Sequence, residues 1–167
     1  MRAIDANTGA ADAPAATPSP VTGIVFRSVW SPAERAAASR LLADSGVPPA
    51  AVHSTGDTAL YGLWDLTAPA GEGLVGVAAT QPLAAAGSVQ LCGIAVRADL
   101  RRRGLGRRLV TEVANVLRAT GATSLAARLE ADYGPAAAVL ARAGFAAPTD
   151  ADGQSAGTDT GWRYLVL

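Results

Sequence analysis

The sequence predicts an α/β fold of the α+β kind, with a mixed, mostly antiparallel central sheet of six to seven strands and about four flanking helices. Short β-prone runs fill much of the first part of the chain, and tight turns between them favour antiparallel pairing. Two helix-like segments follow, and each leads into a further strand-like run, which adds β-α units. The chain has 167 residues and is 50% hydrophobic, so one domain over residues 23–167 is expected.

The N-terminal elements follow from local signals. Residues 1–22 are rich in Ala, Pro, Thr and Ser, a composition that buries little apolar surface, so a flexible tail is expected. Residues 24–30 alternate as a first strand. Ser31, Pro32 and Glu34 then have the spacing of a helix start, and the helix is expected to run to about residue 44. Residues 47–55 are expected to form a loop or short helix.

The middle of the chain reads as strands. Residues 59–66 alternate, residues 69–73 have a turn composition, and residues 74–80 form the second strand of the hairpin. Residues 88–96 are almost continuously apolar, which is typical of a central strand buried on both faces.

The C-terminal elements alternate between helix and strand. Residues 104–119 place Leu and Val at helical spacing, and Gly121 ends this helix. Residues 124–129 predict a short strand, and residues 135–143 predict a helix closed by Gly144. Residues 162–167 predict the last strand.

Composition excludes several classes of function. The formal net charge is zero, so neither nucleic acid nor an anionic membrane is expected as a partner. All basic residues are arginine, so no lysine can form a Schiff base. Cys92 and His53 are the only residues of their types, which excludes an internal disulfide and makes a Cys/His metal site unexpected. No apolar run reaches the roughly 20 residues of a membrane span. These features fit a cytoplasmic protein without a metal.

An arginine-rich loop follows the predicted central strand and leads into a helix that begins near Gly104. Helix N-termini carry unpaired N–H groups and attract phosphate. Gly104 and Gly106 allow the backbone to approach a ligand closely, and the arginines add charge. The loop therefore suits an anion with more than one phosphate. A plain surface loop and a nucleic-acid contact remain as alternatives. A P-loop would need a lysine, and a dinucleotide fingerprint would need glycine where Leu109 stands.

The spacing Arg101-x-x-Gly104-x-Gly106 resembles the phosphate-binding motif of the GNAT superfamily of N-acetyltransferases. The preceding residues 91–96 resemble the fourth strand of that family, and residues 139–145 resemble its segment that ends in Gly-Phe. The likeness extends over about residues 74–147. It implies an N-acetyltransferase that moves an acetyl group from acetyl-CoA, or another acyl-CoA, to a primary amine of a small molecule or peptide by direct attack.

The resemblance also implies a cofactor site. In this family the fourth and fifth strands separate, and the pantetheine of acyl-CoA pairs with the exposed backbone like an added strand. The loop's backbone N–H groups hold the pyrophosphate. The residues implied to bind the cofactor are Ile94, Ala95, Val96, Arg101, Arg102, Arg103, Gly104, Leu105, Gly106, Arg107 and Tyr133.

The catalytic side chains are less well defined. The position of the family's usual glutamate base is Gln90, and that of its usual tyrosine acid is Leu140; neither residue can move a proton. The remaining candidates are Tyr133, Glu130 and His53 as acid or base. Cys92 is interpreted as a small buried hydrophobe or, alternatively, a nucleophile.

The acceptor side has several open alternatives. Three carboxylates near the C-terminus have two interpretations: they attract a cationic amine, or they are solvated loop charges. They are Asp150, Asp152 and Asp159. Trp30, Tyr61 and Trp64 line the pocket or pack in the core. Because Gln90 and Leu140 replace the usual acid and base, a binding module that senses acyl-CoA without catalysis is the alternative to an enzyme. The sequence does not decide the oligomeric state, and a homodimer is one of the alternatives.

Overall fold

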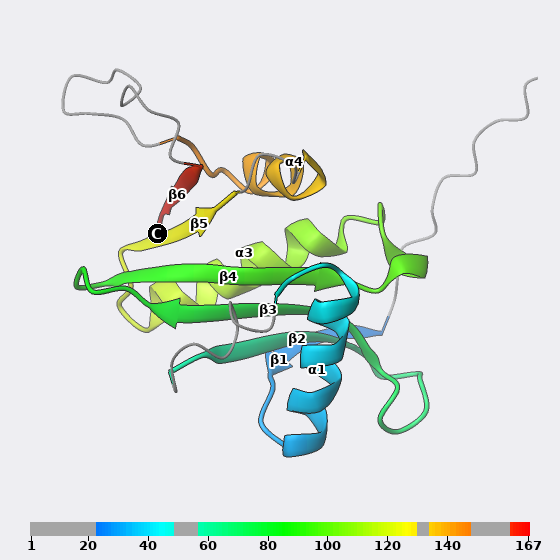
Figure 1. Ribbon diagram of the computed structural model, residues 1–167. Coiled ribbons are helices and arrows are strands. Elements are labelled where there is room, and N and C mark those ends of the chain that lie inside the picture. The colour runs from blue at the N-terminus through cyan, green and yellow to red at the C-terminus, as the bar shows by residue number, and fades with distance from the viewer. Residues whose placement is uncertain (1–22, 49–56, 130–133, 148–160) are drawn as a thin grey trace, which may run out of the picture.

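The computed structural model describes residues 23–48, 57–129, 134–147 and 161–167. Its centre is one six-stranded sheet in which the strands follow each other in chain order from edge to edge (Figure 1). The predicted mixed sheet is therefore confirmed. The strands are β1 (Ile24–Ser28), β2 (Ala59–Asp65), β3 (Leu74–Pro82), β4 (Ser88–Val96), β5 (Ser124–Arg128) and β6 (Trp162–Val166).

All neighbouring strands are antiparallel except β4 and β5, which run parallel. The exception has a simple cause: β4 and β5 are joined by a long helical crossover, whereas short loops over residues 66–73 and 83–87 join β2 to β3 and β3 to β4. An isolated bridge between Ala146 and Tyr164 extends the sheet's edge beside β6.

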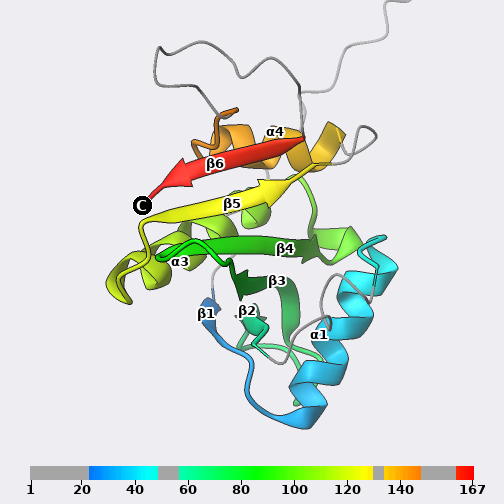
Figure 2. The same cartoon turned by 60° about the vertical axis from the view of Figure 1, so that its left-hand side comes forward.

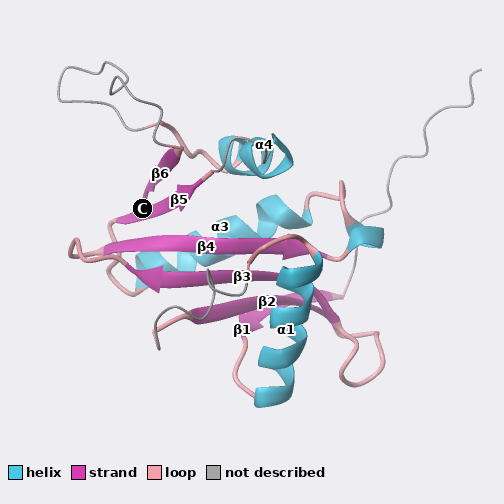
Figure 3. Cartoon of the chain, viewed as in Figure 1, coloured by secondary structure: helices cyan, strands magenta, loops and turns pink. Residues whose placement is uncertain are grey.

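Helices cover both faces of the sheet (Figures 2 and 3). On one face lies α1 (Pro32–Asp44), which packs against β2, β3 and β4. On the other lie α3 (Leu105–Ala119) and α4 (Gly134–Arg142). A short 3-10 helix, η1 (Ala98–Leu100), follows β4 and was not expected from the sequence. No helix in the described part of the chain is both long enough and apolar enough to cross a membrane.

The start of α1 confirms the predicted cap. The Ser31 hydroxyl accepts a hydrogen bond from the Glu34 N–H at 3.2 Å, and the Glu34 carboxylate accepts one from the Ser31 N–H at 3.1 Å. Arg27 on β1 also pairs with Glu34 at 2.6 Å. These contacts lower the pKa of Glu34 from 4.5 to about 2, with the Arg27 hydrogen bond as the largest cause. The cap thus ties the helix to the first strand.

The core has two parts, one on each face. Leu109, Val113 and Leu125 belong to the part under α3, and Leu42 and Val77 belong to the part under α1. Tyr61 and Trp64 are buried in these cores, which confirms the packing interpretation for both.

Trp30 departs from the core interpretation, because its side chain is 76% exposed. The predicted first strand is also too long at this end: β1 stops at Ser28. The reason is the cap of α1, in which the Trp30 N–H donates to Glu34 at 3.1 Å. That bond turns the chain into the helix and leaves the indole outside the core.

Candidate functional site

The strands β4 and β5 pair over only part of their length. Their register runs from Ser88–Ser124 to Leu91–Ala127, after which β5 ends at Arg128 while β4 continues to Val96. Among the described residues, the last five of β4 therefore have β3 on one side and no strand on the other. This is the separation of strands that the family resemblance implies.

The open edge of β4 presents particular main-chain groups. The N–H of Arg97 bonds to the carbonyl of Val75 on the β3 side, at 2.9 Å. Main-chain groups alternate in direction along a strand, so those of Ala95 also face β3 and those of Ile94 and Val96 face the open side. Of the three residues expected to pair with a ligand here, Ile94 and Val96 have the suitable direction.

Arg101 lies in the loop that follows this edge. Its Nε donates to the carbonyl oxygen of Val96 at 3.0 Å, and a terminal nitrogen of the same guanidinium donates to the Ser45 hydroxyl at 3.3 Å. Ser45 is the C-cap of α1. The side chain of Arg101 thus fixes the loop to the end of β4 and to α1. The contact with Ser45 could not be predicted from the sequence, because 56 positions separate the two residues.

The loop then turns sharply into α3. Arg102 and Gly104 both adopt left-handed backbone conformations, with φ of 61° and 79°. Gly104 is the N-cap of α3 and provides no side-chain cap. The first backbone bond into the helix runs from Arg108 to Gly104 at 3.0 Å. Within the described residues, the N–H groups of Leu105, Gly106 and Arg107 have no partner, which is the arrangement that binds anions.

The arginines of this region divide into two groups. Arg97 forms an ion pair with Asp99 at 2.8 Å, which lowers the pKa of that carboxyl. Arg108 donates to the carbonyl of Ile24 at 2.9 Å and so anchors β1. In contrast, the exposed side chains of Arg102, Arg103 and Arg107 form no hydrogen bond or ion pair with any described residue. Arg102 and Arg103 lie in the loop before α3, and Arg107 lies in its first turn.

The two glycines of the motif are not required by packing within the chain. A Cβ at Gly104 would meet nothing within 4 Å, and one at Gly106 would lie at an ordinary 3.5 Å from Val139. Gly104 is favoured by its left-handed backbone, which L side chains rarely adopt. At Gly106, the absence of a side chain leaves space for a ligand in front of the N-terminus of α3.

The structure describes Leu140 and Gln90, the residues expected at the positions of the family's usual acid and base. Leu140 is only 3% exposed and lies in the core under α4. Gln90 is half-buried on β4. Burial raises the pKa of the Cys92 thiol to about 11, so this side chain is uncharged near neutral pH and the packing interpretation is the better one.

The other catalytic candidates, Tyr133, Glu130 and His53, lie outside the described residues, as do Asp150, Asp152 and Asp159. In the part of the chain that is described, no group of three or more His, Cys, Asp or Glu side chains is placed to hold a metal ion.

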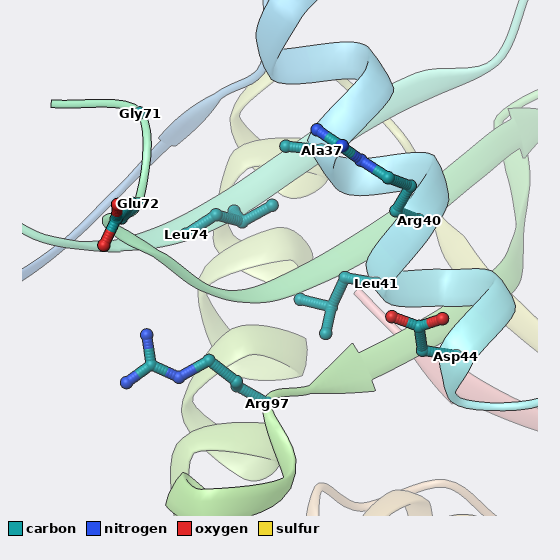
Figure 4. Close-up of a pocket in the computed structure, with 8 residues that line it drawn as sticks. All are labelled: Ala37, Arg40, Leu41, Asp44, Gly71, Glu72, Leu74 and Arg97. Carbon is teal, nitrogen blue, oxygen red and sulfur yellow. The ribbon is translucent and has the colours of Figure 1, made fainter.

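A pocket of about 290 Å³ lies between α1 and the turn that precedes β3 (Figure 4). It has an apolar floor with charged side chains around it, and it does not include the N-terminus of α3. Its lining residues are Ala37, Arg40, Leu41, Asp44, Gly71, Glu72, Leu74 and Arg97.

The sequence of this chain matches a known family. Residues 30–145 match the family described as the acetyltransferase (GNAT) family. The chain belongs to this family. The match contains the open edge of β4, the loop and the whole of α3, so the site lies inside the part that defines a GNAT acetyltransferase. A search of the curated proteins finds no match.

Solved structures share the GNAT fold. A GNAT-family acetyltransferase from Desulfovibrio desulfuricans is 25% identical, with a TM-score of 0.65 over 86% of this chain and 98% of that protein. A Bacillus subtilis acetyltransferase in complex with CoA is 18% identical, with a TM-score of 0.65 over 86% and 99%. The Escherichia coli ribosomal-protein-S18-alanine N-acetyltransferase is 18% identical, with a TM-score of 0.58 over 86% and 92%.

Proposed function

We propose that this GNAT-family protein transfers an acetyl group from acetyl-CoA to a primary amine of a small molecule or peptide. One observation carries the proposal: the unpaired edge of β4 leads, through η1 and one loop, into the N-terminus of α3, which has no side-chain cap. An elongated ligand with an amide-containing arm and a pyrophosphate matches this order of groups. The Bacillus subtilis relative in complex with CoA supports the assignment.

Each part of acyl-CoA has a complementary surface in this arrangement. The pantetheine amides pair with the main chain of Ile94 and Val96, as an added strand would. The pyrophosphate accepts hydrogen bonds from the N–H groups of residues 105–107. The guanidinium groups of Arg102, Arg103 and Arg107 neutralise its charge.

The chemistry is direct acyl transfer. The amine nitrogen attacks the thioester carbonyl carbon, the C–S bond breaks, and CoA leaves as a thiolate that takes up a proton. The nitrogen loses a proton, so an amide and CoA are formed. Gln90 and Leu140 cannot accept or donate this proton. The proton passes to water or to one of the candidates Tyr133, Glu130 and His53, and holding the two reactants together supplies much of the rate.

A second function is favoured by a specific observation: Leu140 is buried in the core and Gln90 is not acidic. An acyl-CoA sensor without catalysis would need the same cofactor site, but it would need no catalytic acid or base at these two positions. The Escherichia coli relative, an S18-alanine N-acetyltransferase, favours the transfer reaction instead.

Two measurements test the proposal. Calorimetric titration with acetyl-CoA tests the cofactor site. If acetyl-CoA produces no heat of binding and no thermal stabilisation, both functions are contradicted. An amine panel with detection of free CoA then separates enzyme from sensor. Release of CoA that depends on the amine supports transfer, and binding without any release supports the sensor.

A further inference from the structure

The pocket between α1 and the turn before β3 has no part in the proposed function (Figure 4). Its volume of about 290 Å³ lies just below the ~300–1,000 Å³ that is typical of sites for drug-sized ligands, so it suits a smaller molecule. Leu41 on α1 and Leu74 on β3 point toward each other across its floor, and Ala37 extends this apolar surface. A ligand that fills the pocket therefore has an apolar part.

Charged side chains of both signs stand on the two walls of this pocket. Arg40 and Asp44 belong to α1 and are one helical turn apart, so they share a face of the helix. Glu72 lies in the turn on the other side, and Arg97 follows the end of β4. Each wall thus presents one guanidinium and one carboxylate. A simple anion or a simple cation would meet a like charge on either wall, whereas a ligand with both charges can pair each of them with its opposite.

These charged groups are available to a ligand. The side chains of Arg40, Asp44 and Glu72 form no hydrogen bond or ion pair with any residue that the structure describes. Arg97 is different, because Asp99 holds its Nε at 2.8 Å and one terminal nitrogen at 3.0 Å and offsets part of its charge. The other terminal nitrogen, Nη1, has no partner among the described residues. The guanidinium is therefore fixed in place with one nitrogen free to bind an anion.

The wall that carries Glu72 and Arg97 is held by main-chain bonds. The Arg97 N–H donates to the Val75 carbonyl at 2.9 Å, and the Asp65 N–H donates to the Gly73 carbonyl at 2.7 Å, which closes the turn. A Cβ at Gly73 would lie 2.7 Å from the Asp65 carbonyl oxygen, so the chain approaches itself closely here. This wall is thus formed before any ligand arrives, which lowers the cost of binding.

The pocket lies at the end of β4 that is remote from the acyl group. In the proposed function the pyrophosphate lies at α3 and the pantetheine pairs with Val96 and then with Ile94. The acyl group therefore lies farther back along the strand, near Leu91, where β4 and β5 separate. At about 3.3 Å per residue, Leu91 is roughly 20 Å from Arg97. A small amine in the pocket cannot reach the thioester, so the occupant is not the acceptor.

The pocket adjoins both anchors of the Arg101 side chain. Arg101 donates to the Val96 carbonyl, and the next residue is Arg97; it also donates to the Ser45 hydroxyl, and Asp44 precedes that residue. A ligand that contacts Arg97 and α1 together holds these two anchors at a fixed separation. The loop between β4 and α3 is then held in one shape, so the pocket and the cofactor site are coupled.

We propose that this pocket binds a free α-amino acid with an aliphatic side chain and that this ligand is an effector of cofactor binding. Its carboxylate pairs with Arg97, its ammonium with Glu72, and its side chain lies on Leu41 and Leu74. The occupied pocket tightens the binding of CoA, and by reciprocity CoA tightens the binding of the amino acid. The binding site goes beyond the proposed function, and the effect on CoA rests on it.

Calorimetry on the full chain tests the site, with leucine as the probe. We expect leucine to bind, and we expect leucinamide and isocaproate, which lack the carboxylate and the ammonium, to bind about tenfold more weakly. Ala37→Met fills part of the pocket and should abolish leucine binding. Ala36→Met, at the exposed neighbouring position of α1, is the matched control and should bind leucine normally. Glu72→Gln keeps the shape of the side chain, removes its charge and should weaken leucine binding about tenfold.

A second titration tests the coupling. CoA replaces acetyl-CoA here, because it binds without donating an acyl group. Saturating leucine should lower the Kd for CoA about fivefold in the wild type and should have no effect in Ala37→Met. An unchanged Kd for CoA in the wild type overturns the effector role.

The failures of the two proposals are distinguishable. A chain that binds leucine but not CoA overturns the proposed function and the coupling, while the amino-acid site stands. If leucine, valine, isoleucine and methionine all give no heat at millimolar concentration, the amino-acid site is overturned and the proposed function stands. The site is also overturned if Ala37→Met binds leucine as the wild type does, because leucine then binds elsewhere, the acceptor site included.

Discussion

The Nε of Arg101 donates a hydrogen bond to the carbonyl oxygen of Val96 at 3.0 Å, across the turn that links β4 to α3. Val96 is the last residue of β4, and its main chain faces the open side of that strand. The same guanidinium reaches Ser45 at the end of α1. Arg101, the first residue of the family's motif, therefore positions the loop between β4 and α3.

Removal of this side chain should weaken cofactor binding indirectly. We expect Arg101→Ala to lower the affinity for acetyl-CoA about tenfold, because hydrogen bonds from a charged group contribute about 1.5–3 kcal/mol and hold the loop in its binding shape. Calorimetry measures the affinity. Arg118→Ala, which removes an exposed 3.0 Å bond to Asn115 on α3, is the control and should bind normally. An unchanged Kd for Arg101→Ala would show that the loop keeps its shape without the clamp.

Substitutions at Gly104 should separate backbone strain from ligand exclusion. Its φ of 79° makes any L side chain unfavourable by about 1 kcal/mol, although a Cβ would meet nothing within 4 Å. Gly104→Ala should thus lower the free energy of unfolding slightly and retain some acetyl-CoA binding. Gly104→Glu should show a similar loss of stability and no binding, because its carboxylate would repel the pyrophosphate. Gly104→Gln distinguishes charge from size. If Gly104→Glu keeps the wild-type Kd, the pyrophosphate lies elsewhere.

The boundaries of the fold were predictable where they depend on local chemistry. Ser31 and Glu34 begin α1 as their spacing indicates, and glycines follow the ends of α3 and α4. Trp30 was not predictable, because its exposure depends on how the cap of α1 turns the chain. Contacts between distant residues were equally hidden, and Arg108 with Ile24 is an example.

In the candidate site, too, features that depend on adjacent residues were predictable and contacts between strands were not. The motif from Arg101 to Gly106 predicts a phosphate-binding turn, because glycine and helix-terminus chemistry can be read from adjacent residues. The 3.1 Å hydrogen bond between the side chains of Gln81 and Gln90 depends on the register between β3 and β4, which includes a bulge between Ala79 and Thr80. A shift of one residue would place the two amides on opposite faces. Sequence spacing alone does not fix such a register.

A third prediction concerns Gly93, which is buried in the middle of β4. A Cβ there would lie 2.8 Å from Val47 and 3.2 Å from Leu42, so the chain after α1 would have to move. We expect Gly93→Ala to lower the free energy of unfolding by about 1–3 kcal/mol through overpacking. Gly134→Ala is the control, since a Cβ at that first position of α4 meets nothing within 4 Å. Chemical denaturation measures the free energy of unfolding of both variants. If Gly93→Ala is as stable as Gly134→Ala, α1 adjusts to the added methyl group without a loss of stability.

The last prediction concerns the ion pair that joins β1 to α1. Glu34 has its pKa lowered from 4.5 to about 2, first by the hydrogen bond from Arg27 and then by those from Ser31 and Trp30. A carboxyl whose pKa is lower in the folded state stabilises that state above its unfolded pKa. This contribution is lost as the pH falls through the folded pKa. Stability should therefore decline as the pH falls from about 4.5 toward about 2.

Glu34→Gln tests this directly, because glutamine at the same position can still complete the cap but carries no charge. Near neutral pH the variant should be less stable than the wild type, and the difference should disappear by about pH 2. Urea denaturation across this range measures it. High salt should shrink the difference, since the Arg27 side chain is 44% exposed and the pair is screened. Glu72→Gln, in an exposed turn, is the control. A stability difference that persists at the lowest pH would mean that the amide fails to complete the cap, so that the lost hydrogen bonds and not the charge account for the effect.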